Sequence, residues 1–181
     1  DKDTLKPDGT LEIPDIGLGE AYLGKASYVV YDEEDIDDDM LKLVCARKYN
    51  EPLVIARTER FIIREMTVED LPHLYELYQT LSDCPYVEQL YEYEDEKAFT
   101  IKYIENMYGF FGYGLWLVFD KKTGELVARA GVENRSIDGQ NCQELGYLVK
   151  KSWQGKHVAW EVMNHIVDIA MDRFGLEELY M

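Results

Sequence analysis

Residues 145–160 contain the residue types that point most directly to binding chemistry. The stretch reads LGYLVKKSWQGKHVAW, with three lysines and no acid, whereas the whole chain has 36 Asp and Glu residues and a net charge of -17. A strand-like run at Leu145–Val149 leads through a polar turn into residues 154–159, and an apolar helical pattern follows at once. The first amides of a helix lack partners within the helix, and the helix dipole adds partial positive charge there. This arrangement predicts a site for a phosphate.

Several elements must position this loop, and the first two are a strand and a helix. A short strand begins at Arg60, and a helix follows it, capped at Thr67 with Asp70 three residues on. A second helix is predicted over 94–108, because acids lie in its first turn and four apolar residues are spaced to share one side. These four are Ala98, Ile101, Ile104 and Tyr108.

The sequence next predicts strands joined by short loops. Strands over 115–119 and 125–133 are separated by the hairpin-sized loop 120–124, which has a glycine at its end. A second loop, Ser136–Asn141, leads into the strand that carries ELGY (144–147).

The loop at 154–159 resembles the acyl-CoA motif of the GCN5-related N-acetyltransferases (GNAT): Gln or Arg, two residues, Gly, one residue, then Gly or Ala. Gln154, the pair Gly155–Lys156 and Ala159 fit this pattern, and His157 stands in place of the central glycine. A side chain there either crowds a pyrophosphate or holds the loop in a different conformation. Three stretches, MYGFFGYGLW, GELVARAGVE and ELGY, resemble sequences of the ribosomal-protein N-acetyltransferase branch of this family.

This resemblance implies the fold, the domain limits and the cofactor. The fold class it implies is α/β (α+β), with a mixed, mostly antiparallel central sheet flanked by helices. The catalytic domain would span 57–181 and would use acetyl-CoA. In the family, the strand that matches Leu176–Met181 is followed by a helix, which commonly supplies a tyrosine as general acid, and by two more strands. We therefore expect these C-terminal elements to be missing, and no residue is assigned as the acid.

The resemblance also implies which residues hold the cofactor. Backbone groups of one strand would bind the pantetheine arm and polarise the thioester carbonyl; they belong to Tyr147, Leu148 and Val149. Loop and helix residues would hold the pyrophosphate: Gln154, Gly155, Lys156, His157, Val158, Ala159 and Trp160. Lys156 would add a point charge. For His157 two interpretations stay open, an exposed loop residue or a contact to phosphate or adenine.

Glu144 and Glu133 are the candidates for the catalytic base. Each lies on a strand expected to line the cleft, and each could accept the proton of an incoming ammonium through water. We favour Glu144. The alternative is a carboxylate on a solvated strand face, or one paired with Arg129 or Arg135, because most strand glutamates are not catalytic.

Residues 1–56 lie outside the resemblance and are predicted to be an appended α/β segment, the end of a preceding domain. A strand is predicted at Ala26–Tyr31 and a helix at Asp37–Tyr49. Seven acids between Asp32 and Asp39 raise the question of a calcium site. Because the loop glycine and the alternating ligands of an EF-hand are lacking, we interpret these acids as a solvated helix N-terminus.

Composition limits the partners. At -17 the chain repels nucleic acid, and it attracts cations such as a small-molecule amine or a cationic peptide. The sequence predicts no membrane segment and no structural metal, because it lacks both a long apolar run and a zinc-ligand spacing. Cys45, Cys84 and Cys142 are far apart and odd in number, which favours reduced thiols and a cytoplasmic location. The oligomeric state stays open, with a homodimer as one option.

Two functional hypotheses follow. The first is an acyl-CoA-dependent N-acyltransferase that moves an acetyl group from acetyl-CoA to a primary amine of a small molecule or a protein N-terminus. The second is a non-catalytic member of the same fold that binds CoA or a protein partner.

Overall fold

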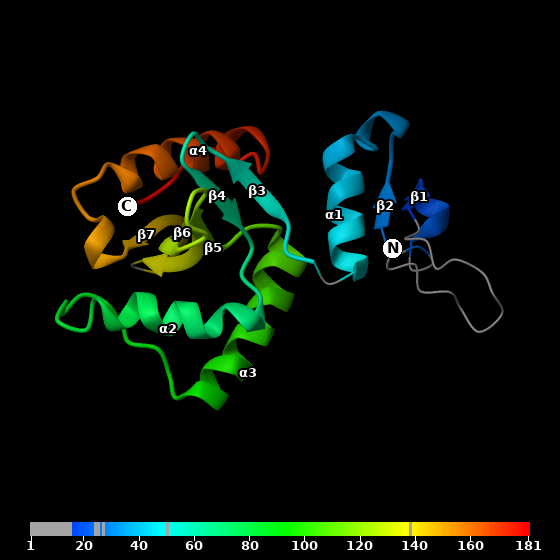
Figure 1. Cartoon of the computed structure of the whole chain (residues 1–181). Helices are drawn as coiled ribbons and strands as arrows, with labels where there is room; N and C mark the ends of the chain where they lie inside the picture. The colour runs from blue at the N-terminus through cyan, green and yellow to red at the C-terminus, as the bar shows by residue number, and fades with distance from the viewer. Residues whose placement is uncertain (1–15, 24–25, 27, 50, 138) are drawn as a thin grey trace. The chain divides into compact units, whose positions relative to one another are not determined.

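The chain forms two compact units, residues 1–53 and 54–181 (Figure 1). The computed structural model describes residues 16–23, 26, 28–49, 51–137 and 139–181. In the first unit, β1 (Ile16–Leu18) pairs in parallel with β2 (Tyr28–Val30), and α1 (Asp38–Tyr49) follows. The strand predicted at 26–31 and the helix predicted at 37–49 are therefore confirmed. The prediction that this unit ends a preceding domain remains a prediction, and residues 1–15 lie outside the described part.

The acids before α1 cap helix ends. The Asp37 Oδ1 atom accepts a hydrogen bond from the Met40 amide at 2.7 Å, and Asp32 Oδ1 accepts one from the Glu34 amide at 3.2 Å. Carboxylates in the first turn of a helix are stabilised by its unpaired amides. The interpretation of these acids as a helix N-terminus is thus confirmed. Within the described ranges, no three His, Cys, Asp or Glu side chains are grouped so that they could hold a metal ion.

The second unit is built on a five-stranded antiparallel sheet with the strand order β3-β4-β5-β6-β7. An isolated parallel bridge from Glu144 to Tyr180 extends it at one edge. This confirms the predicted mixed, mostly antiparallel sheet. The strands are β3 (Val54–Arg57), β4 (Phe61–Arg64), β5 (Leu115–Asp120), β6 (Leu126–Ile137) and β7 (Gln140–Val149).

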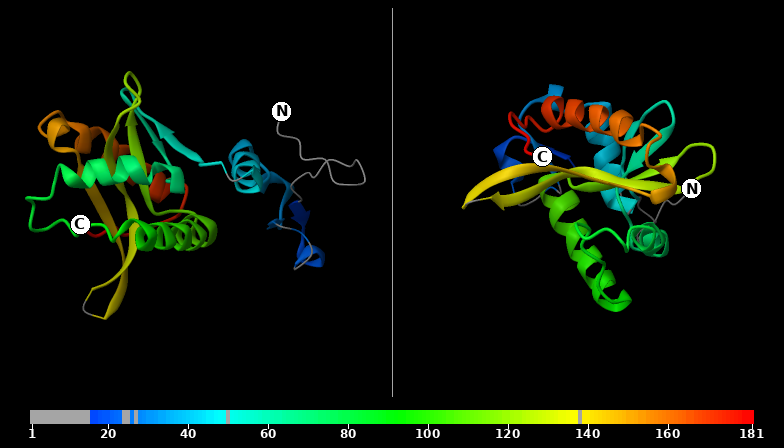
Figure 2. Two further views of the ribbon diagram at one scale, coloured as in Figure 1. Left: turned by 60° about the horizontal axis from the view of Figure 1, so that its bottom comes forward. Right: turned by 90° about the vertical axis from the view of Figure 1, so that its left-hand side faces the viewer.

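Helices cover both faces of this sheet (Figure 2), with α4 on one face and α2 and α3 on the other. α4 buries every fourth residue against the sheet, at Val158, Val162, Ile166 and Ala170, which explains its apolar helical pattern. The helices are α2 (Leu71–Gln79), α3 (Tyr93–Tyr103) and α4 (Val158–Asp172). Short 3₁₀ helices span Glu20–Tyr22, Glu33–Asp35, Val68–Asp70 and Lys151–Trp153. No helix in the described ranges is long and apolar enough to cross a membrane.

The cap predicted at the start of α2 is present. The Asp70 carboxylate accepts hydrogen bonds from the Thr67 amide at 2.8 Å and from two Arg64 nitrogens at 2.6 and 2.7 Å. Burial raises the pKa of Asp70, but the hydrogen bonds from Arg64 and Thr67 outweigh it, so that the pKa lies below its usual value. Asp70 therefore stays ionised and fixes the turn between β4 and α2.

The helix predicted over 94–108 buries a different face from the one predicted. Glu96, Thr100 and Tyr103 face inward, whereas Ala98 and Ile101 are exposed, so the predicted apolar face was wrong. The Glu96 carboxylate is used inside, where it accepts a hydrogen bond from the Tyr91 amide at 3.0 Å. After Tyr103 the helix widens to a π-helix (Ile104–Phe111). Its i to i+5 spacing returns Tyr108 to the buried side.

One prediction about the strands needs correction, and one strand was missed. The loop predicted at Ser136–Asn141 is wrong, because β6 and β7 pair as far as Ile137 and Gln140, and Gly139 in the turn between them has φ at 78°. The strand β3 was not predicted. It is an edge strand of four residues paired with β4, and its isolated VIAR pattern is too short to identify from periodicity.

Gly131 on β6 allows the backbone just before β5 to approach closely. A Cβ atom at Gly131 would lie 2.0 Å from the Gly114 carbonyl oxygen, which is backbone and cannot move aside. The replacement Gly131→Ala should therefore destabilise the protein by about 2 kcal/mol or more and lower the melting temperature. Gly146→Ala is the matched control, because a Cβ there meets only the Leu115 Cδ2 atom at 3.4 Å. Equal melting temperatures of the two variants would contradict this account.

Candidate functional site

The outer edge of β7 presents backbone groups beyond the sheet. The Leu145 amide donates to the Tyr180 carbonyl at 2.7 Å, and the Tyr180 amide donates to the Gln143 carbonyl at 2.8 Å. Backbone groups alternate along an antiparallel strand, so those of Tyr147 and Val149 also point away from β6. The Val149 carbonyl confirms this direction, because it accepts a hydrogen bond from the Gln154 side-chain amide at 3.1 Å. An extended ligand can therefore pair with the backbone of Tyr147.

The turn between β7 and α4 uses two residues with positive φ. Gly155 has φ at 74°, and a Cβ there would meet nothing within 4 Å, so the space above this position is open. His157 caps α4 with φ at 59°, and among the described residues it is the one residue other than glycine with positive φ. The loop thus keeps the left-handed conformation that glycine favours, and the imidazole is exposed. The first amides of α4 follow directly and suit an anion.

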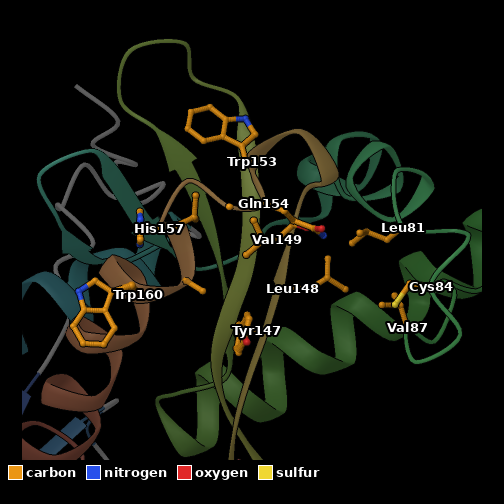
Figure 3. A pocket seen from close by; sticks show the side chains of 13 residues that line it. Leu81, Cys84, Val87, Tyr147, Leu148, Val149, Trp153, Gln154, His157 and Trp160 are labelled. Carbon is orange, nitrogen blue, oxygen red and sulfur yellow. The ribbon is translucent and has the colours of Figure 1, made fainter.

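The edge of β7 and the start of α4 line one cleft, with a volume of about 490 Å³ (Figure 3). One side, which we call the loop side, is formed by Gln154, Gly155, His157, Val158, Ala159 and Trp160. The other side lies across β7 from His157 and Trp160 (Figure 3), and we call it the apolar side; it is formed by Leu81, Cys84, Val87 and Leu148. Tyr147 and Trp160 remain 53% and 71% exposed, so both rings are open to a ligand.

Every residue predicted to hold the cofactor lines this cleft except Lys156. The Lys156 Nζ atom lies instead 5.0 Å from the centre of the Trp153 ring, at the exposed surface of the loop. The other two lysines of the basic stretch have carboxylate partners. Lys150 pairs with Glu125 at 2.8 Å, and Lys151 pairs with Asp83 at 3.0 Å. Of the three charges that suggested an anion site, Lys156 is the one best placed to act on a ligand.

The start of α4 is held by Glu161. Its carboxylate accepts hydrogen bonds from the Arg60 amide at 2.9 Å, from Arg60 Nε at 2.6 Å and from the Thr58 hydroxyl at 2.5 Å. Burial raises the pKa of Glu161, but these hydrogen bonds outweigh it, so that the pKa lies below its usual value. Arg60 also donates to the Lys156 carbonyl at 3.0 Å. The turn between β3 and β4 therefore fixes both the loop and the first turn of α4.

Glu133 and Glu144 are directly opposite each other on β6 and β7. Arg135 joins them, with Nε 3.0 Å from Glu144 and a terminal nitrogen 3.3 Å from Glu133. The pairing with Arg135 that we considered from the sequence is thus present, whereas Arg129 bonds the Tyr78 hydroxyl at 3.0 Å. Such a bridge removes the repulsion between two facing carboxylates.

A tyrosine of α3 also holds Glu133. The Tyr103 hydroxyl donates to Glu133 at 3.1 Å and accepts from the Leu115 amide at 2.7 Å. Burial raises the pKa of Tyr103, so the phenol stays protonated and remains a donor. Glu133 is therefore held from two sides, and Glu144, with 39% of its side chain exposed, is the more accessible of the two carboxylates.

Glu144 shares a face of β7 with the apolar side of the cleft. Residues two apart on a strand point the same way, so Glu144, Gly146 and Leu148 lie in a row on the face that α2 and α3 cover. The β6–β7 register is unbroken from Ala128 to Val149, so no bulge turns Glu144 away. Neither Glu144 nor Glu133 lines the cleft itself. The sequence did not reveal Leu81, Cys84, Val87 or Trp153 as lining residues.

A cleft that combines an open strand edge with a helix start suits an extended ligand with an anionic end. The profile described as "Acetyltransferase (GNAT) domain" matches residues 60–181, and the chain therefore belongs to the GNAT acetyltransferase family. This family uses acetyl-CoA, which is the cofactor predicted from the loop at 154–159. The residues fit such a cofactor, since the space above Gly155 is open and the Tyr147 backbone points outward.

Individual proteins resemble the chain more distantly. YkkB of Bacillus subtilis (strain 168) is 30% identical over 114 residues, which cover 61% of this chain and 64% of that protein. The chain thus spans less than two thirds of the length of that relative. The ribosomal-protein-S5-alanine acetyltransferase of Vibrio fischeri shares the fold with a TM-score of 0.58 at 14% identity, over 68% of this chain and 70% of that one.

A second solved structure contains the cofactor. RimL, a ribosomal L7/L12 alpha-N-protein acetyltransferase in complex with coenzyme A, has a TM-score of 0.54 at 13% identity. The similarity covers 70% of this chain and 72% of that one. Both structural similarities, at identities of 13% and 14%, concern the fold alone.

The left-handed conformation of His157 yields a test of its role. Since glycine has no steric cost at this φ, His157→Gly should keep or raise CoA affinity and change stability by no more than about 1 kcal/mol. Calorimetric titration with CoA and thermal unfolding measure the two quantities. A fall in affinity at unchanged stability would mean that the imidazole contacts the cofactor.

Proposed function

We propose that this protein is an N-acetyltransferase that moves the acetyl group of acetyl-CoA to a primary amine of a small molecule or a protein N-terminus. The observation that carries this proposal is the cleft at the junction of β7 and α4. It joins outward backbone groups of Tyr147 to the first amides of α4 and lies within the domain that matches the family.

Different residues of the cleft would bind different parts of the cofactor. The backbone of Tyr147 would pair with the pantetheine arm, in the way that a further strand pairs with a sheet edge. The amides from Gly155 to Trp160 would hold the pyrophosphate, and Lys156 would add charge at the surface. Gln154 acts indirectly, since its amide bonds the Val149 carbonyl and ties the loop to the strand. Rigid positioning of this kind supplies much of the rate of a transfer reaction.

The chemistry requires a neutral amine. When bound, acetyl-CoA supplies a thioester whose acetyl group passes to the amine nitrogen while the thiol departs. Glu144 would take the extra proton of an arriving ammonium, directly or through one water. Arg135 and the strand pairing hold this carboxylate in place. Glu133 lies deeper and would orient Arg135.

The net charge of the chain supports a cationic acceptor, and its cysteines support a cytoplasmic location. A net charge of -17 attracts amines, which arrive as cations at neutral pH. Cys45, Cys84 and Cys142 are free thiols, which support the cytoplasm as the place of action.

Calorimetric titration with CoA tests the proposal. CoA should bind, and Lys156→Glu should weaken binding about 10-fold, because it places a negative charge beside the phosphates. Lys102→Glu is the matched control, since it makes the same charge change on the exposed surface of α3. No binding at millimolar CoA would exclude an acyl-CoA-dependent activity. Binding with no acetyl transfer to any amine would favour the non-catalytic alternative.

The proton acceptor has its own test. Glu144→Gln should lower kcat about 100-fold at neutral pH, leave CoA affinity intact and flatten the acidic limb of the pH–rate profile. Glu133→Gln, which changes the facing carboxylate of the same pair, should have a smaller effect. Loss of activity in Glu133→Gln with a normal rate in Glu144→Gln would transfer the role to Glu133. Normal rates in both variants would mean that the proton leaves through solvent.

A further inference from the structure

Apart from His157, the residues that line the cleft in the described part of the chain are apolar, aromatic or amide side chains, a thiol and a glycine. Although 30% of the residues are Asp, Glu, Lys or Arg, none of them lines the cleft in the described part of the chain. The apolar side is the clearest case, with two leucines, a valine and a thiol. Leu81 is buried, and Cys84, Val87 and Leu148 are partly exposed. Water on such a surface is readily displaced by an apolar group.

The strand next to the apolar side has no side chain at Gly146. Gly146 lies two residues before Leu148 and faces the same side of β7. A Cβ at Gly146 would have only Leu115 Cδ2 as a neighbour within 4 Å, at 3.4 Å. The face therefore presents, in order, the Leu148 side chain, a glycine with the Leu115 side chain beside it, and the Glu144 carboxylate. At about 3.3 Å per residue, Leu148 and Glu144 are about 13 Å apart. A molecule with an apolar body and a short arm ending in an amine spans such a distance.

From this order we infer that the acyl acceptor is a primary amine carried on an apolar body, such as an arylalkylamine. This rests on the proposed function and names its substrate class. The apolar body lies against Leu81, Val87 and Leu148, and the arm crosses Gly146 with its nitrogen directed to Glu144. An acetyl group is a single methyl beyond the carbonyl, so it leaves the apolar side to the acceptor. A second cation on the acceptor would lose its hydration there without a partner, which disfavours diamines.

Two amines of similar length test this inference with acetyl-CoA as donor. The value of kcat/KM for 2-phenylethylamine should exceed that for 1,4-diaminobutane about 10-fold or more, because an apolar pocket discriminates on this scale. Val87→Ser should lower the value for 2-phenylethylamine about 5-fold or more and leave that for 1,4-diaminobutane nearly unchanged. Val54→Ser is the matched control, since Val54 is an exposed valine on β3, at the opposite edge of the sheet.

A binding measurement separates this inference from the proposed function. Calorimetric titration of the full protein in the presence of CoA should show tighter binding of 2-phenylethylamine than of 1,4-diaminobutane. If CoA binds but 1,4-diaminobutane is bound or acetylated preferentially, the acetyltransferase assignment stands and the inference is overturned. Acetylation of neither amine overturns it as well. A higher kcat/KM for octanoyl-CoA than for acetyl-CoA would overturn it in favour of an acyl chain on the apolar side.

Discussion

The Glu161 carboxylate holds the part of the structure on which the cleft depends. It accepts three hydrogen bonds from Thr58 and Arg60, and it lies in the first turn of α4. Without these hydrogen bonds, the helix start would be joined to the sheet by the loop after β7, by the hydrogen bond from Arg60 to the Lys156 carbonyl and by the apolar face of α4. The hydrogen bonds fix where the unpaired amides of α4 point. An acid in the first helical turn also complements the helix dipole, so the same carboxylate stabilises the helix that it positions.

The position of β7 at the edge of the sheet is the second requirement. An edge strand exposes backbone donors and acceptors, which soluble proteins usually cover or interrupt. Here Tyr180 covers the groups of Gln143 and Leu145, and the Gln154 side chain covers the Val149 carbonyl. The backbone of Tyr147 lies between these two caps. The outward backbone groups of Tyr147 thus stay open to a ligand between two covered positions, and this limits the length of the ligand segment that can pair with the strand.

Local sequence patterns identified the loop but not the surroundings of the cleft. Residues 154–159 are contiguous, so their motif can be recognised in the sequence. The buried positions of α4 follow a regular spacing of four residues, which predicts a helix. Glu161 and Arg60, by contrast, are 101 residues apart, and Leu81 and Val87 reach the cleft only through tertiary packing. The inner face of α3 was predicted wrongly because Glu96 and Thr100 are polar yet buried, and a π-helix then changes the spacing. The sequence left either Arg129 or Arg135 as a possible partner of Glu144, because the partner depends on the register of β6 and β7.

Tyr103 at the end of α3 and Tyr108 in the π-helix that follows both bond Leu115, and Tyr103 also links α3 to the candidate catalytic carboxylates. The Tyr103 hydroxyl accepts from the Leu115 amide, and the Tyr108 hydroxyl donates to the Leu115 carbonyl. The two phenols thereby replace the neighbouring strand at the point where β4 has already ended. The Tyr103 hydroxyl also donates to Glu133, and Arg135 joins Glu133 to Glu144. Three consecutive polar contacts therefore connect helix α3 to the two facing carboxylates. A molecule that displaced α3 from outside would therefore also disturb the carboxylates, without entering the cleft.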